Sequence, residues 1–403
     1  MAAQIKDARN EAQDRRPILI DRIDGIDSDV LCATILPNED GFISINDDKS
    51  IRIWLKRETG KYWPSVCHYT DRVPTCLFHQ PDSRRLFIGL DSGNILEYAV
   101  GEDYNKITLI KQYQAHTGRV TYVHNSVEHD WILSASKDKY FTFHSTENGQ
   151  RVGSHSIGGV ATCLVFDTGS KHCFVGDDNG KIAFLKLTDG GCEFKALLNR
   201  HESSISCLAW DADRKFLFSG SFDKTIICWD IGGQKGITYD LEGHHERIQR
   251  VIFIGNTHQL VSGSEDSFIV VWDMDAKRIE NPEWRESDVC EYCKKPFIWN
   301  LKGMWEQKTV GKRQHHCRRC GAAICDDCSK SRVSIPILGH EFEVRICCEC
   351  GPKITSAEKT PLAQFYDSKH SILDMSFDEK RKYLLTVGLD RVIKIWDMNS
   401  IIA

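Results

Sequence analysis

The string Asp223-Lys-Thr-Ile-Ile-Cys-Trp229-Asp230 recurs along most of the chain. Three other copies keep the tryptophan, and three weaker copies carry a different residue in its place. In chain order, the residues at this position are Trp54, Glu97, His144, Phe184, Trp229, Trp272 and Trp396. The steps between them run from 40 to 47 residues until the last, which is 124 residues. The chain is therefore a repeat with one long interruption.

This repeat predicts an all-β fold. A period near 43 with Trp-Asp endings is typical of the blades of WD-repeat propellers. Apolar and polar residues alternate within each copy, as in 225–229, which is the pattern of short strands. A single blade leaves apolar faces open to water, whereas blades stacked around an axis cover one another. We therefore expect a seven-bladed β-propeller.

The copies also share polar residues that resemble parts of a catalytic set. His116, His201 and His244 each precede the tryptophan position by 28 residues, and an Asp opens the turn before that strand. Because these residues recur from blade to blade, we expect them to be buried hydrogen-bond partners that brace the blades. A catalytic set would occur once, so we predict no catalytic residues and no enzymatic activity.

The interruption indicates an inserted domain. The last step exceeds one period of 43 by 81 residues, which places an insertion between blades six and seven. Pro and Gly residues at 281–282 and 351–352 mark where the chain leaves and rejoins the strand pattern. The expected divisions are a flexible N-terminus at 1–16, blades one to six with a closing strand at 17–280, the inserted domain at 281–353, and a linker with blade seven at 354–403.

The last blade lacks a strand at its own end of the chain. Only six residues follow Asp397, too few for the fourth strand that each blade needs. The apolar run 17–20, continued by Arg22 and Ile23, lies upstream of the first repeat. We predict that it pairs into the last blade and closes the ring, which would remove the open sheet edges.

The inserted domain holds nine of the 17 cysteines. Eight of them form Cys-x2-Cys pairs, in chain order Cys290/Cys293, Cys317/Cys320, Cys325/Cys328 and Cys347/Cys350. Small two-zinc domains commonly interleave their ligands, so we expect pairs one and three to bind the first zinc ion and pairs two and four the second. Four thiolates leave no open coordination position, which predicts two structural zinc ions as cofactors.

The overall composition indicates a protein of the reducing cytoplasm. The net charge is −5, and the first sixteen residues contain no apolar core of signal-peptide length. No stretch approaches the roughly 18 apolar residues of a membrane helix. We expect the eight cysteines outside the inserted domain to be reduced, semi-buried apolar residues.

A basic segment surrounds the second cysteine pair. Between Lys308 and Arg319 there are five Lys or Arg residues and no acidic residue. Arg345 precedes the fourth pair by two residues, so interleaved zinc sites would bring it near this segment. Arginine side chains match phosphate oxygens with paired hydrogen bonds. This arrangement favours a phosphate-binding surface over an ordinary solvated loop.

The string 313–318 (Arg-Gln-His-His-Cys-Arg), the sequence Arg-Ile-Cys at 345–347 and the order of the pairs resemble the FYVE zinc finger. The resemblance implies binding of phosphatidylinositol 3-phosphate in endosomal membranes. It assigns a set of headgroup-binding residues: Arg313, His315, His316, Arg318, Arg345 and, at the acidic position, Asp288.

The sequence departs from the FYVE pattern at three places. Gln314 stands where a second basic residue is usual, and Ser287 stands at the usual acidic position, with Asp288 one step later. In addition, 23 residues separate the first two cysteine pairs, more than in short FYVE domains. Within this longer segment we expect Thr309 and Val310 to form the membrane-inserting loop and Trp305 to be structural.

Nearly the whole chain resembles the WD-repeat and FYVE domain-containing adaptor proteins. The resemblance implies a scaffold of the cytoplasm and the early endosome membrane, bound peripherally. Its propeller would recruit signalling proteins, kinases among them.

Two alternative functions have their own signals. A RING-like ubiquitin ligase has a similar order of pairs, but RING ligands usually include a histidine, and the His-His-Cys-Arg segment is foreign to them. Binding of nucleic acids or histone tails would use the basic segment. The chain is net acidic and no aromatic ladder accompanies the segment, so we expect no nucleic-acid partner.

Overall fold

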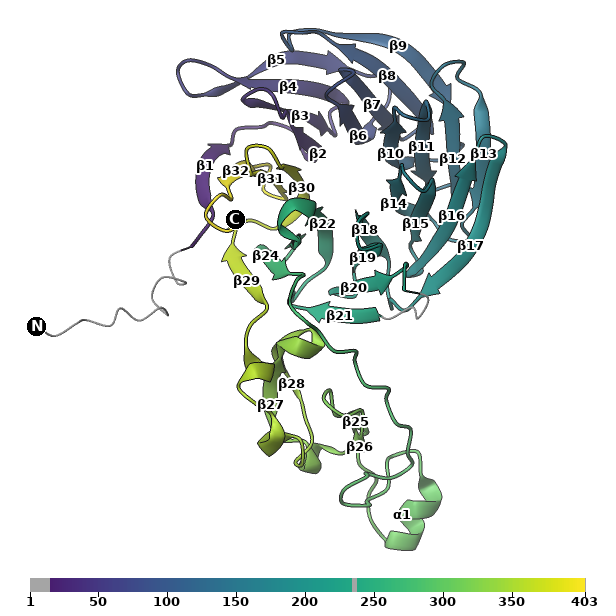
Figure 1. The fold of residues 1–403 in the computed structure, drawn as a ribbon, viewed down its shortest axis with the longest axis vertical. Helices are drawn as coiled ribbons and strands as arrows, with labels where there is room; N and C mark the ends of the chain where they lie inside the picture. Colours follow the sequence, from purple (N-terminus) through teal and green to yellow (C-terminus); the bar gives the residue numbers. More distant parts are fainter. Residues whose placement is uncertain (1–14, 234–237, 403) are drawn as a thin grey trace, which may run out of the picture. The chain divides into compact units, whose positions relative to one another are not determined.

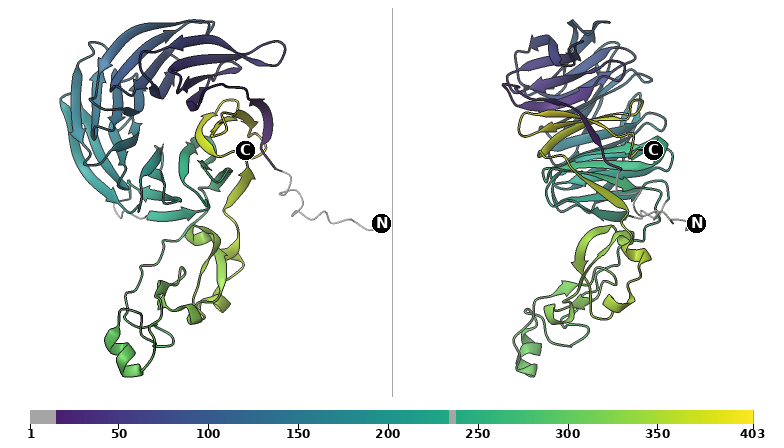
Figure 2. Two further views of the ribbon diagram at one scale, coloured as in Figure 1. Left: turned by 180° about the vertical axis from the view of Figure 1, so that it is seen from behind. Right: turned by 90° about the vertical axis from the view of Figure 1, so that its left-hand side faces the viewer.

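The computed structural model describes residues 15–233 and 238–402, and most of the described strands belong to four-stranded antiparallel sheets (Figure 1, Figure 2). Most of the flexible N-terminus expected at 1–16 lies outside the described residues. By contact density the chain divides into two compact units, one of 1–224, 244–271 and 365–403 and one of 225–243 and 272–364.

The first four sheets each consist of four consecutive strands. They are β2 (Val30–Ile35), β3 (Gly41–Asn46), β4 (Ser50–Lys56) and β5 (Tyr62–Tyr69); β6 (Pro74–Gln80), β7 (Arg85–Leu90), β8 (Asn94–Val100) and β9 (Ile107–Gln114); β10 (Val120–Ser126), β11 (Trp131–Ser136), β12 (Tyr140–Ser145) and β13 (Arg151–Ser156); β14 (Ala161–Asp167), β15 (His172–Asp177), β16 (Lys181–Thr188) and β17 (Gly191–Asn199).

The other three blades draw strands from distant parts of the sequence or adjoin the insertion. They are β18 (Ile205–Asp211), β19 (Phe216–Ser221), β20 (Thr225–Asp230) and β21 (Thr238–Glu242); β22 (Ile248–Ile254), β23 (Gln259–Ser264), β24 (Phe268–Asp273) and β29 (Ala363–Asp367); β30 (Ile372–Asp378), β31 (Tyr383–Gly388), β32 (Ile393–Asp397) and β1 (Ile18–Ile23). A short 3-10 turn, η1 (Gly255–Thr257), joins β22 to β23. These seven sheets confirm the predicted seven-bladed propeller.

Strand β29 locates the insertion within the sixth blade. It pairs with β24 as the fourth strand of that sheet, and the zinc-finger segment lies between the two strands in the sequence. The insertion thus falls between the sixth and seventh Trp positions, as expected, but it precedes the last strand of blade six. The stretch 354–403 was expected to hold a linker and blade seven, and the structure adds a strand of blade six to it.

The repeated histidines are buried braces, as predicted. His116 Nδ1 lies 3.0 Å from Asp138 Oδ2, and its Nε2 lies 2.9 Å from the hydroxyl of Ser134. In the same way, Nδ1 of His201 lies 2.7 Å from Oδ2 of Asp223, and Nδ1 of His244 lies 3.0 Å from Oδ2 of Asp266. Because both nitrogens of each buried imidazole have polar partners, the histidine holds the turn that carries the Asp against the strand that carries the Ser.

Asp374 on β30 links three neighbouring blades. Its carboxylate accepts a hydrogen bond from the backbone N–H of Ala33 on β2 at 3.0 Å and forms an ion pair with Arg250 on β22. The Asp374 side chain is 3% exposed, so the Arg250 partner balances a carboxylate that water does not reach. The ion pair therefore ties blade six to blade seven at the place where the ring closes.

The insertion contains short elements. They are α1 (Leu301–Gln307), β25 (His315–His316), β26 (Ala323–Ile324), η2 (Asp326–Cys328), β27 (Arg332–Ile335), η3 (Pro336–Leu338), β28 (His340–Arg345), η4 (Gly351–Lys353) and η5 (Ala357–Lys359). Within the second unit, β28 pairs in parallel with β21 where His340 meets Glu242, and His340 Nδ1 lies 2.9 Å from the Glu242 carboxylate. Gly339 has φ 86°, and a Cβ there would lie 1.6 Å from the carbonyl oxygen of Asp240, so this junction requires glycine.

The predicted closing strand is confirmed. Strand β1 pairs antiparallel with β32, from Ile18 opposite Asp397 to Ile23 opposite Ile393 (Figure 1). Ile23 is 8% exposed and belongs to the same apolar cluster as Val387 and Ile393. The N-terminal strand therefore completes the last blade.

We predict that Ile23→Ala lowers the free energy of unfolding by about 2–5 kcal/mol, because it removes buried methyl groups from the closure. Ile18, on the same strand, is 61% exposed. Ile18→Ala should change stability by no more than about 0.5 kcal/mol. Denaturant unfolding of both variants measures the difference, and equal stability of the two would contradict the closure.

Candidate metal centres and basic pocket

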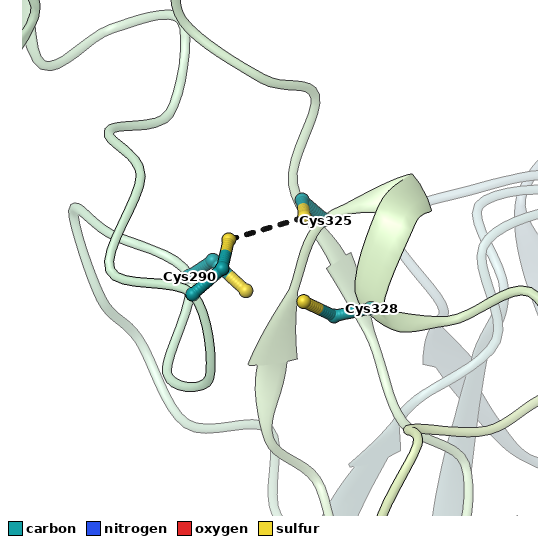
Figure 3. Close-up of side chains that lie close together, drawn as sticks. Cys290, Cys325 and Cys328 are labelled. Carbon is teal, nitrogen blue, oxygen red and sulfur yellow. Dashed lines mark hydrogen bonds between the residues drawn. The ribbon is translucent and has the colours of Figure 1, made fainter.

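The first cysteine cluster brings the first and third cysteine pairs together. Its sulfur atoms all lie within 4.8 Å of one another and belong to Cys290, Cys293, Cys325 and Cys328. Figure 3 shows the sulfurs of Cys290, Cys325 and Cys328 turned toward a common centre. Burial raises the pKa of Cys290, but the backbone N–H groups of Cys293 and Cys325 outweigh it and lower the pKa to about 7. In the same cluster burial raises the pKa of Cys325 and of Cys328, so Cys290 is the thiol whose thiolate form this cluster favours.

The second cluster joins the basic segment to the end of β28. It consists of Cys317, Cys320, Cys347 and Cys350, again with sulfurs within 4.8 Å of one another. The backbone N–H of Cys347 donates to the sulfur of Cys317 at 3.3 Å, and the hydroxyl of Tyr292 donates to the sulfur of Cys347 at 3.1 Å. Each cluster thus brings together the two cysteine pairs that the sequence analysis assigns to one zinc ion. The remaining cysteine, Cys348, is exposed and belongs to neither cluster.

Both clusters fit zinc. Each presents four sulfur ligands, the donor set of closed structural zinc sites. The apolar cluster of the insertion also centres on these cysteines, with Phe297, Ile324 and Ile346 fully buried among them. A core this small makes the metal a major source of folding free energy for the insertion.

We predict that Cys347→Ser removes the second zinc ion and unfolds the insertion around it, because one of four thiolates is lost. Its neighbour supplies a matched control, since Cys348→Ser should retain two zinc ions per chain. Zinc content and limited proteolysis of the two variants measure this difference. Equal loss of zinc in both would contradict the ligand assignment.

The second cluster brings Arg345 beside the basic segment. The backbone N–H of Arg318 donates to the carbonyl of Arg345 at 3.0 Å, across 27 residues of sequence. Arg345 also donates to Asp326 at 2.7 Å and to the Ser329 hydroxyl at 2.8 Å. His315, on β25, lies 3.0 Å from the same Asp326 oxygen. The backbone of Arg318 thus lies beside Arg345, and His315 and Arg345 approach the same carboxylate. We refer to Arg345, His315, Arg318, His316 and Arg313 together as the basic pocket.

The charges in this pocket act on one another. Burial lowers the pKa of His315, Arg345 lowers it further, and Asp326 acts in the opposite direction. The hydrogen bond from Arg345 lowers the pKa of Asp326 below its ordinary value. Asp326 is thus an ionised partner of Arg345 and lies beside a His315 imidazole whose charged form is disfavoured.

Trp284 forms a platform under the pocket. Its ring stacks on His316 with centroids 4.8 Å apart and planes inclined by 7°, and the Arg318 guanidinium lies 4.7 Å from the Trp284 ring centre. His316 Nε2 also lies 3.2 Å from the carbonyl oxygen of Arg285. Stacking fixes the planes of the His316 ring and the Arg318 guanidinium. No pattern in the sequence indicated this contact.

The other expected headgroup residues are placed differently. Arg313 is exposed beside β25. Gln314 donates to the carbonyl of Ser287 at 3.5 Å. The carboxylate of Asp288 accepts a hydrogen bond from the indole N–H of Trp299 at 3.1 Å. Asp288 is therefore engaged with the start of the long loop.

The long loop, residues 294–316 between the first two cysteine pairs, exposes several large apolar side chains. Val310, at the predicted membrane-inserting position, is 87% exposed, and the backbone N–H of Thr309 caps α1 by donating to the carbonyl of Met304 at 3.1 Å. Trp305 is 86% exposed and Leu301 is 72% exposed, both on α1. The prediction that Trp305 is structural is wrong, because a seven-residue helix in this loop has no packed core to receive it.

Comparison with known proteins agrees with this geometry. Residues 282–356 match the model of the FYVE zinc finger, and 107–143, 192–230, 235–273 and 359–397 match the WD domain, G-beta repeat. WD repeat and FYVE domain-containing protein 2 of Mus musculus is 46% identical, covering 100% of both chains. The chain belongs to the WD repeat and FYVE domain-containing protein family.

More distant matches extend the family and the fold. WD repeat and FYVE domain-containing protein 1 of Mus musculus is 44% identical over 100% of this chain and 97% of its own. WD repeat and FYVE domain-containing protein 2 of Caenorhabditis elegans is 35% identical, and the match covers 96% of this chain and 94% of that protein. The WD40 propeller domain of Doa1 shares the fold, with a TM-score of 0.61 at 13% identity, covering 95% of this chain and 97% of that one. None of the described helices is long and apolar enough to cross a membrane.

Proposed function

We propose that this chain is a non-enzymatic adaptor that binds phosphatidylinositol 3-phosphate through its FYVE zinc finger. The observation that carries the proposal is the pairing of Arg318 with Arg345. Their backbone hydrogen bond at 3.0 Å brings two basic segments that are distant in the sequence together. Guanidinium groups in such a position suit the paired oxygens of a phosphate monoester.

The pocket residues take separate roles in this proposal. Arg345 and Arg313 supply charge to the 3-phosphate, and Arg318 holds it from the Trp284 platform. The imidazoles of His315 and His316 donate hydrogen bonds from the strand β25. Asp288 contacts the headgroup only if its bond with Trp299 opens, so it contributes less than the basic residues.

The exposed apolar loop would supply a second membrane contact. Leu301, Trp305 and Val310 together extend the predicted loop of Thr309 and Val310 onto the helix α1. One phosphate-binding pocket alone gives modest affinity, and stable attachment generally takes two signals. The apolar loop and the pocket lie in one small zinc-held domain, so they would reach the same bilayer together.

The propeller would then present partners at this membrane. Seven blades give a rigid scaffold, and their loops carry the variable side chains that bind proteins. We propose signalling proteins, kinases among them, as the partners. The early endosome membrane is the proposed site of action, reached from the cytoplasm by peripheral binding.

We predict that Arg318→Ala weakens binding to vesicles containing phosphatidylinositol 3-phosphate about 10- to 100-fold, the effect of losing a charge-assisted hydrogen bond of about 1.5–3 kcal/mol. Lys359→Ala is the charge-matched control, since Lys359 is an exposed residue of η5. Sedimentation with vesicles of each phosphoinositide isomer measures both affinity and selectivity. Binding without preference for the 3-phosphate would overturn the proposed function.

We predict that Trp305→Ser weakens vesicle binding roughly tenfold, because burial of a large side chain contributes about 1.5–3 kcal/mol. It should leave affinity for the soluble inositol 1,3-bisphosphate headgroup unchanged. Trp63→Ser on β5, where Trp63 is 54% exposed, is the control for loss of an exposed indole. If Trp305→Ser and Trp63→Ser bind vesicles equally well, α1 does not enter the membrane.

A further inference from the structure

Asp326 contacts two of the residues that are proposed to bind phosphate, Arg345 and His315. Its carboxylate accepts from Arg345 at 2.7 Å and lies 3.0 Å from His315 Nε2. The Arg345 and His315 side chains are 22% and 18% exposed, whereas the Asp326 side chain is 60% exposed. The more exposed carboxylate thus lies on the solvent side of Arg345 and His315.

The two metal clusters hold this arrangement in place. Asp326 follows Cys325 of the first cluster directly, and Arg345 lies two residues before Cys347 of the second. The backbone of Asp326 is also fixed, because its carbonyl accepts from the N–H of Ser329 at 3.2 Å. The Asp326 carboxylate can therefore move away from Arg345 and His315 by a side-chain rotation, with no rearrangement of the zinc ligands.

The surroundings make this carboxylate the immediate competitor of a phosphate. Arg313 and Arg332 also act electrostatically on His315, and Arg332 lies opposite Arg345 in the β27–β28 pairing. The neighbouring Asp327 faces away to Lys312, 3.4 Å from its carboxylate. Asp326 is thus the acidic side chain in direct contact with both Arg345 and His315.

We propose that Asp326 is an internal counterion of the basic pocket, which a ligand phosphate must displace before it can bind both Arg345 and His315. This inference rests on the proposed function and concerns its regulation. A carboxylate and a phosphate use the same N–H donors of a guanidinium, so they cannot both occupy them. Two anions a few Å apart also repel each other, and this repulsion weakens the binding of any anion that cannot expel the carboxylate.

Displacement would set a threshold for binding. A phosphate monoester carries more charge than a carboxylate and can replace it, whereas the phosphodiesters and carboxylates of ordinary lipids cannot. Arg345 keeps the Ser329 hydroxyl as a second partner at 2.8 Å, so its side chain stays in position when the carboxylate leaves. Asp326 therefore lowers the affinity of the pocket for a phosphate monoester but also prevents weaker anions from binding there.

The test compares Asp326→Asn with Asp327→Asn in the full, zinc-loaded chain. Both variants lose one negative charge at adjacent positions, but only the first loses the anion that covers the pocket. We expect Asp326→Asn to bind vesicles with phosphatidylinositol 3-phosphate roughly tenfold more tightly, from the removal of one unit charge near the phosphate. Asp327→Asn should change binding less than about twofold at physiological salt, where exposed charges are screened.

A second arm uses Arg345→Gln as the background. If the carboxylate competes for Arg345, Asp326→Asn should gain much less affinity when Arg345 is absent. Asp326→Asn should also gain binding to phosphatidylserine vesicles, because the weaker anion no longer has to expel a carboxylate. Equal or weaker binding of Asp326→Asn to the 3-phosphate would overturn the inference and would show instead that Asp326 positions Arg345.

The inference and the proposed function can fail separately. If the wild-type chain shows no preference for the 3-phosphate, the proposed function fails, and inorganic phosphate becomes the probe. Thermal stabilisation by inorganic phosphate should then be larger for Asp326→Asn than for Asp327→Asn. Equal stabilisation would overturn the counterion as well. Zinc content of two ions per chain in each variant confirms that the insertion is folded.

Discussion

Thiolate coordination by metal holds the insertion together and determines where its charges lie. Each cluster joins cysteine pairs from separate segments, with Cys290 and Cys328 in one cluster and Cys317 and Cys350 in the other. The segments are short, so few apolar contacts could position them without the metal. The second cluster places Arg345 against Arg318, and the first places Asp326 against both Arg345 and His315. The pocket is thus a consequence of the crossed ligand sets.

The propeller holds the insertion by both of its ends. The chain leaves blade six after β24 and returns as β29, the last strand of the same blade. Folding of that blade therefore has to bring together strands that are separated by the whole zinc finger. The ring itself is closed by β1 on β32 and by the contact of Asp374 with Arg250. Both closures join the N-terminal or central part of the chain to its C-terminal blade.

Much of this architecture could be predicted from the sequence, because repetition and ligand number leave few choices. The missing strand after Asp397 had to come from elsewhere, and four equal cysteine pairs had to form two sites. Strand β29 could not be placed in blade six, since it follows the zinc finger and carries no tryptophan marker. The exposure of Trp305, the stacking of Trp284 and the contacts of Asp326 depend on tertiary packing. The spacing of residues in a sequence does not show which side of a short helix is exposed to solvent or which carboxylate forms an ion pair with an arginine.

The most direct test follows zinc content and headgroup binding in the same samples as the metal is removed. A chelator titration of the full chain would be sampled for zinc per chain and for affinity toward soluble inositol 1,3-bisphosphate. If the metal centres build the pocket, binding falls in step with zinc and returns when zinc is restored. A zinc-free chain that binds the headgroup as tightly as the loaded chain would contradict the account.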